Sequence, residues 1–228
     1  MKKISALLML AALFSLALGQ DCKFYFPAGE NSRLEYKNFD KKNKLTGSSK
    51  QRVKEVKKGP SSVTAVIEAE YFDSKGASQG KGELTARCEK GIFYIDMSNY
   101  LNQQSMESYK DMEVSIEGGA LEMPSSLAPG DVLKSGEMKM TFSSGGMTLM
   151  TLSVMISNRK VEALENVTTE AGTFSCYRIS YDITTKMGFT VSSRGVEYYN
   201  DEIGMVKSET YDKKGELQGS VVLNAYSK

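Results

Sequence analysis

Apolar and polar residues alternate with a period of two through most of the chain. In the segment 63–71, Val63 and Ile67 fall on one face, whereas Glu68 and Glu70 fall on the other. Further runs of this kind are 138–142, 150–156 and 177–183. Such alternation is typical of strands with one buried face and one face in water. About a dozen such runs, separated by turns, predict an antiparallel all-β fold.

Three similar strings lie between these runs, namely FDKKNKLTG at 39–47, FDSKGASQG at 72–80 and YDKKGELQG at 211–219. In each string the aspartate can accept a hydrogen bond from a backbone N–H two residues further on. Asn43, Gly76 and Gly215 occupy the position that needs a positive φ. We therefore predict three hairpin turns instead of three catalytic Asp/Lys clusters. A fourth hairpin turn, of another type, is predicted at 143–146.

Residues 1–19 have the pattern of a signal peptide. A positive start is followed by an apolar run and by small residues before a cleavage site expected after Gly19. Residues 20–228 contain no low-complexity stretch that would divide them, so we expect a single domain. Asp21 stands before Cys22, where a lipoprotein signal needs a small residue, so no lipid anchor is expected. We expect an exported chain, periplasmic or extracellular, without a transmembrane segment once the signal peptide is removed.

The composition argues against several classes of function. The chain has no histidine, which removes Ser-His-Asp and Cys-His catalysis and every zinc site that uses histidine. Its formal net charge of +1 argues against a nucleic-acid binder, which would show a basic excess. We expect no enzyme activity, no cofactor and no metal site. The enzyme hypothesis would need a deep polar pocket that holds carboxylates with shifted pKa values.

The three cysteines are Cys22, Cys88 and Cys176. In an oxidising compartment this odd number allows one disulfide and one remaining thiol. A Cys22–Cys88 disulfide would tie the N-terminus to a strand and contribute about 4 kcal/mol in the chain-entropy model. Cys176 stays open as an alternative partner of either cysteine. No Cys-x-x-Cys motif is present, so a structural role is favoured over a redox role.

Methionine is unusually frequent, with 13 in the chain. Thioethers suit soft metals such as Cu(I), but these methionines recur at strand spacing and have no histidine beside them. A buried core face is one interpretation, and the lining of a cavity for a flexible apolar ligand is another. The candidate lining residues are Met138, Met140, Phe142, Met150, Leu152 and Val154.

Two further segments depart from the strand pattern or from an even charge distribution. Residues 98–111 lack alternation and β-branched residues, and Ser98 could cap a helix, so we predict a short helix or lid over the sheet.

Residues 37–58 are strongly basic. A basic patch could meet an anionic surface. Because its basic residues alternate at 50, 52 and 54, a solvated strand face is the favoured interpretation.

Two motifs carry a resemblance to a known family. The first is T-x-A-G-T-F-x-C-Y-x-I, at 169–179, and the second is G-x-V-K-S-E, at 204–209. Together with Cys22 and the FDKK string, they resemble the DUF3108-like family, whose members are exported proteins of Bacteroides-type bacteria. The resemblance implies one large, curved antiparallel sheet or open barrel with a helix or loop over its mouth, similar to the periplasmic carriers of lipoproteins. It implies no catalytic residue.

The leading hypothesis is a non-enzymatic envelope protein that binds a lipid or another apolar small molecule inside an open β-barrel. The alternative is a structural module that binds another envelope protein through a strand edge or the basic patch.

Overall fold

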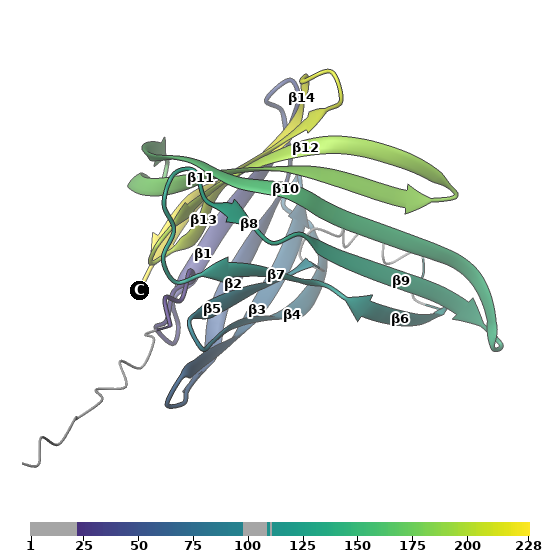
Figure 1. Ribbon diagram of the computed structural model, residues 1–228, viewed down its shortest axis with the longest axis horizontal. Helices are drawn as coiled ribbons and strands as arrows, with labels where there is room; N and C mark the ends of the chain where they lie inside the picture. The colour runs from purple at the N-terminus through teal and green to yellow at the C-terminus, as the bar shows by residue number, and fades with distance from the viewer. Residues whose placement is uncertain (1–21, 98–108, 110) are drawn as a thin grey trace, which may run out of the picture.

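The computed structural model describes residues 22–97, 109 and 111–228. The predicted signal peptide lies outside these residues, as does the predicted helix or lid except for Tyr109 and Asp111. Figure 1 shows the described chain as one curved sheet that wraps into a nearly closed barrel. The sheet has fourteen strands, and every strand pair is antiparallel, which confirms the predicted fold class.

The strands are β1 (Arg33–Asp40), β2 (Leu45–Lys58), β3 (Ser62–Asp73), β4 (Ser78–Glu89), β5 (Ile92–Asp96), β6 (Glu113–Gly118), β7 (Ala120–Pro124), β8 (Val132–Leu133), β9 (Gly136–Ser144), β10 (Met147–Thr169), β11 (Gly172–Met187), β12 (Phe189–Asn200), β13 (Gly204–Asp212) and β14 (Leu217–Ser227). Their order in the sheet is β6-β9-β10-β11-β12-β13-β14-β1-β2-β3-β4-β5-β7, and β8 pairs with β10. The first strand therefore pairs with the last, and β6 and β7, which follow each other along the chain, lie at opposite edges.

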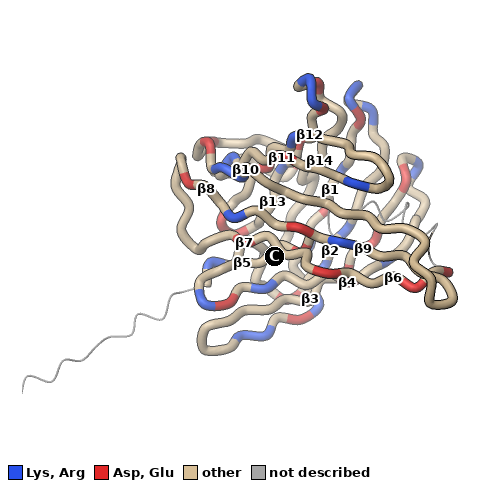
Figure 2. Tube along the Cα trace, turned by 45° about the vertical axis from the view of Figure 1, so that its right-hand side comes forward, with Lys and Arg blue, Asp and Glu red and all other residues tan. Residues whose placement is uncertain are grey.

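The three predicted Asp turns join neighbouring strands as hairpins. The carboxylate of Asp40 accepts hydrogen bonds from the backbone N–H groups of Lys42 and Lys44, both at 2.9 Å. These hydrogen bonds hold the pKa of Asp40 below its usual value, and the bond from the N–H of Lys44 has the largest effect. Asn43 has a φ of 58°, as its place in the turn requires. The same arrangement occurs at Asp73–Gly76 and Asp212–Gly215. Figure 2 shows lysines at the hairpin ends beside β1 and β14.

The two edges of the sheet meet at a place that we call the seam, where β7 contacts β9. Gly119, between β6 and β7, connects the two sides through its own peptide groups. Its N–H donates to the carbonyl of Glu137 at 3.0 Å, and its carbonyl accepts from the N–H of Met97 at 2.6 Å. Because Gly118 and Gly119 both have positive φ, glycine is needed for this turn.

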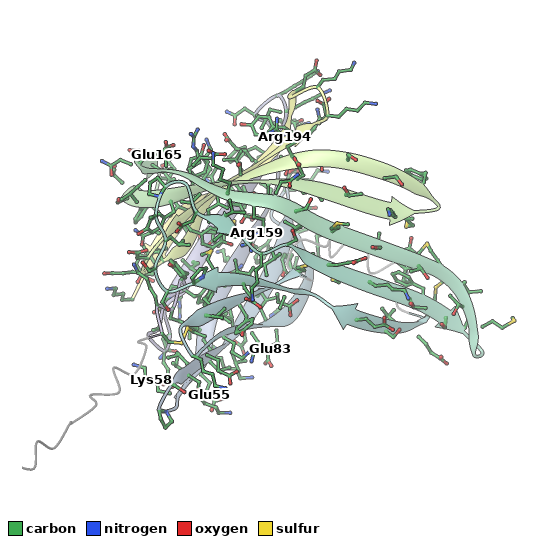
Figure 3. All side chains as sticks on the ribbon, in the orientation of Figure 1. Glu55, Lys58, Glu83, Arg159, Glu165 and Arg194 are labelled. Atoms are coloured by element: carbon green, nitrogen blue, oxygen red, sulfur yellow. A yellow bond between two sulfur atoms is a disulfide. The ribbon has the colours of Figure 1, made fainter. Side chains whose placement is uncertain are left out.

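A buried arginine forms a second connection across the seam. Arg159, which Figure 3 labels, lies on β10 opposite Leu133 of β8 and is only 3% exposed. Its Nη1 donates to the carbonyls of Glu122 in β7 and Lys134, both at 2.8 Å. A buried charge is tolerated only when it is hydrogen-bonded in this way.

The segment before β1 packs into the barrel. Phe24 and Tyr25 are buried, and both rings lie edge-on against Phe93 of β5. The Tyr25 hydroxyl donates to the carbonyl of Pro124 at 2.9 Å. Just before these residues, Cys22 forms a disulfide with Cys88 of β4. Cys176 has a free thiol and is fully buried.

We expect Gly118→Ala to weaken the seam. A Cβ at Gly118 would lie 2.4 Å from the carbonyl oxygen of Glu137, at a φ of +73°. Gly76 has a similar φ of +84° but open space around it, so Gly76→Ala is the matched control for backbone strain. Urea unfolding should show a loss of about 1 kcal/mol for the control and at least about 2 kcal/mol more for Gly118→Ala. Equal losses would contradict the role given to the seam.

We expect the disulfide to contribute much of the stability. Cys22 and Cys88 are 66 residues apart, so Cys22→Ser/Cys88→Ser should lower the free energy of unfolding by about 4 kcal/mol. Urea unfolding of this variant and of the reduced wild-type protein should give similar losses. An oxidised wild type no more stable than the double variant would refute the prediction.

Candidate functional site

The barrel contains a cavity of about 630 Å³ that is open to solvent. It is lined by residues of eight neighbouring strands, in the order β12-β13-β14-β1-β2-β3-β4-β5, and by Tyr25 and Phe26. It extends from Tyr25 and Phe93 to residues beside the β1–β2 and β3–β4 turns, among them Thr46 and Asp73. Its aromatic lining residues are Tyr25, Phe26, Tyr36, Tyr71, Phe72, Phe93, Tyr94 and Tyr199.

The aromatic lining is interrupted by polar groups. Hydroxyl-bearing lining residues come from several strands, including Ser49 of β2 and Ser208 and Thr210 of β13. Glu197 of β12 also lines the cavity, and it is 4% exposed. An occupant would therefore meet apolar rings and hydrogen-bonding groups in the same space.

Glu197 is held by a neighbouring tyrosine. The hydroxyl of Tyr181 on β11 donates to Glu197 Oε1 at 2.8 Å. Burial, followed by the charge of Glu197, raises the pKa of Tyr181 well above its usual value. Tyr181 pairs with Gly195 across the strands, and a Cβ on Gly195 would lie 2.3 Å from its ring. Glycine at this position thus lets the tyrosine lie flat against β12 and reach the carboxylate.

Tyr36 joins β1 to the backbone of β13, two strands away in the sheet. Its ring lines the cavity, and its hydroxyl donates to the carbonyl of Met205 in β13 at 2.9 Å. Burial raises the pKa of Tyr36 above its usual value of 10.0. The residue therefore acts as a neutral hydrogen-bond donor that fixes the distance between β1 and β13.

The predicted lining residues lie elsewhere in the barrel. Met138, Met140, Phe142 and Val154 are buried in the main core, and Met150 and Leu152 are half-buried against it. They pair across β9 and β10 as Met138 with Val154, Met140 with Leu152 and Phe142 with Met150. The structure thus brings all six onto one face, but none of them is among the residues that line the cavity. Their role in ligand binding stays a prediction.

Two other candidate chemistries gain no support from the described residues. Burial raises the pKa of the Cys176 thiol to about 12, and the negative charge of Glu165 is the next largest cause. The reactive thiolate is therefore scarce at neutral pH. No group of three or more His, Cys, Asp or Glu residues in the described chain could hold a metal ion.

The basic segment 37–58 is a mixed surface once it is folded. Arg52 pairs with Glu68 of β3 at 2.6 Å, and Lys54 pairs with Glu83 of β4 at 3.4 Å. The hydrogen bond from Arg52 is the main reason why the pKa of Glu68 lies below its usual value. Because acidic neighbours balance these strands, they do not form a uniformly positive patch.

The Tyr36 hydroxyl gives the fold a pH dependence in alkali. Its folded pKa lies above the unfolded value near 10, so its contribution is complete below pH 10 and is lost as the pH rises. Above about pH 10 the unfolding free energy should fall by up to about 1.4 kcal/mol per pH unit for this group. Tyr36→Phe should be about 1 kcal/mol less stable at pH 7 and should show a shallower alkaline decline. Parallel declines in urea unfolding would exclude this assignment.

Comparison with known proteins gives three findings. A family model described as DUF3108-like matches residues 29–223. No curated protein matches the chain. Two solved structures are similar to it, one of an exported protein with a YmcC-like fold from Bacteroides fragilis and one of a lipoprotein from Parabacteroides distasonis. The first is 26% identical with a TM-score of 0.77, and the second is 27% identical with a TM-score of 0.78. Each alignment covers 91% of this chain and 100% of the solved chain.

Proposed function

The chain belongs to the DUF3108-like family, as its motifs indicate, and we propose that it is an exported envelope protein that binds an amphiphilic small molecule in its barrel. The observation that carries this proposal is the cavity of about 630 Å³ lined by residues of β12–β14 and β1–β5. The similar structures from Bacteroides fragilis and Parabacteroides distasonis, described as an exported protein and a lipoprotein, support the envelope location. The absence of a lipid anchor stays a prediction.

The size and lining of the cavity support a lipid-like occupant. Cavities that bind small molecules usually measure about 300–1,000 Å³, which is the range found here. Rigid rings such as those of Tyr36, Tyr71 and Phe93 offer apolar area to an acyl chain or a ring system. Burying that area would favour binding by about 25 cal/mol per Å², before the costs of association.

The polar residues support an amphiphile over a pure hydrocarbon. Hydroxyl groups of the lining residues Ser49 and Thr210 can hydrogen-bond to a polar end of the ligand. A hydrocarbon would leave such groups without this partner, which costs free energy when water is displaced. The Cys176 thiol is not among the lining residues, so it offers no nucleophile to an occupant of the cavity.

The proposal is tested by titrating the delipidated protein with cis-parinaric acid, a fluorescent acyl chain. Ala86 is buried and lines the cavity, so Ala86→Phe should fill part of it and weaken binding about tenfold. Met150→Phe is the matched control, because Met150 belongs to the methionine face and does not line the cavity. Circular dichroism should show that both variants are folded.

The outcomes of this titration separate the two candidate linings. Weak binding by Ala86→Phe alone supports the aromatic cavity. Weak binding by Met150→Phe alone moves the site to the methionine face. If the wild-type protein binds no probe and native mass spectrometry finds no copurifying lipid, the proposal is refuted.

A protein partner is the second candidate function. Among the described strands β6 stands at an edge, and all six of its residues are exposed, so this edge could accept a strand from another protein. Crosslinking in the native host should then capture one stoichiometric protein partner, and no small molecule should copurify.

In the described part of the chain, no helix is long and apolar enough to cross a membrane.

A further inference from the structure

Two long hairpins extend beyond the body of the barrel. Figure 1 shows the β9–β10 and β11–β12 hairpins reaching out on the same side of the molecule. Their ends carry large apolar side chains that face solvent. Met147 and Leu149 are 70% and 55% exposed on the first hairpin, and Phe189 and Val191 are 67% and 49% exposed on the second. We call these four residues the apolar ends.

The apolar ends differ from the other hairpins in charge. The β1–β2, β3–β4 and β13–β14 turns each carry an aspartate and at least one lysine. By contrast, segment 138–158 has Lys139 as its single charged residue, and segment 183–193 has Lys186. Figure 2 shows the ends of both long hairpins with little charge. Exposed hairpin ends are normally protected from association by charge, so its absence here indicates a contact surface.

We propose that the apolar ends dock this protein on the surface of a lipid bilayer. Each end is a tight turn flanked by hydroxyl-bearing residues, such as Ser144 and Thr148 on one hairpin and Thr190 on the other. Backbone groups pair across each hairpin, between Ser144 and Met147 and between Met187 and Phe189. The apolar side chains can therefore enter the boundary between headgroups and acyl chains without exposing many unpaired peptide groups to it.

The shape of the surface favours a bilayer over a protein partner. A stable protein interface needs a contiguous patch of about 800 Å² on each partner. The apolar ends lie instead on two protrusions, the β11–β12 hairpin and the β9–β10 hairpin with β6 beside it, and a fluid bilayer can admit both.

Charge favours an anionic bilayer. Lys186 is exposed near the end of β11, and segment 183–193 contains no carboxylate. On the other hairpin Lys139 lies 3.9 Å from Glu117 of β6, and Glu113 of β6 stands opposite Ser143. These carboxylates limit entry of the β9–β10 hairpin to its terminal turn, so Phe189 and Lys186 lead the contact.

The test is flotation of the full chain with vesicles made of phosphatidylethanolamine and phosphatidylglycerol, with no other ligand added. Met147→Ser/Phe189→Ser should lower the fraction of bound protein about tenfold or more. Val132→Ser/Leu164→Ser is the matched control, because these residues are 80% and 53% exposed outside the two ends. The control should bind like the wild type, and equal melting temperatures should show that both variants fold.

Lys186→Glu should weaken binding to the anionic vesicles more than binding to phosphatidylcholine vesicles.

The proposal is wrong if the wild-type protein does not float with the anionic vesicles, or if the control variant loses as much binding as the end variant. It is also wrong if sedimentation shows a dimer that the end variant disrupts, because a second copy would then cover these residues. Since no ligand is added, failure of the cavity proposal would leave the result unaffected.

Discussion

The structure depends on how a sheet with two free edges is closed. Open edges present unpaired backbone groups, and a sheet of this length must either join its edges or protect them. Here the strands at the two edges, β6 and β7, are consecutive in the chain, so one short connection can reach both sides. Gly119 forms hydrogen bonds to both sides, and the guanidinium of Arg159 holds β7 against the strand pair β8–β10. The barrel interior exists because this seam is held.

Within the barrel, the two halves are filled differently, and side-chain stiffness gives a reason. On β9 and β10, Met138 and Met140 pack into the core, because unbranched thioether side chains adapt to irregular gaps. On the opposite half, tyrosine and phenylalanine rings such as Tyr71 and Phe93 are stiff and surround an open volume. Tyr36 and Tyr181 are fixed in addition by hydrogen bonds to Met205 and Glu197. A cavity bounded by fixed rings resists collapse, which is what a binding site for an amphiphile requires.

The charge pattern of the outer surface is also uneven. On β2, Arg52 and Lys54 pair with acidic residues of β3 and β4, and Lys50 pairs with Glu35 of β1, so this part of the barrel body carries charges of both signs. The two long hairpins lack this balance because they carry almost no charge at their ends. The exposed apolar side chains of the two hairpin ends therefore stand apart from the charged surface of the barrel body.

The sequence by itself determined the antiparallel all-β class, the hairpin turns and the family, because alternation, turn chemistry and short motifs are local properties. It named Cys22–Cys88 as one of three pairings, and folding brought those two sulfur atoms together. Only the tertiary structure decided that Arg159 points inward, since the register shifts between Ser157 and Lys160 and interrupts the alternation there. It also decided that residues of β1 to β5 and β12 to β14 line the cavity of about 630 Å³. Alternation tells which face of a strand is dry, but whether that face is packed or hollow depends on the strands across the barrel, far away in the sequence.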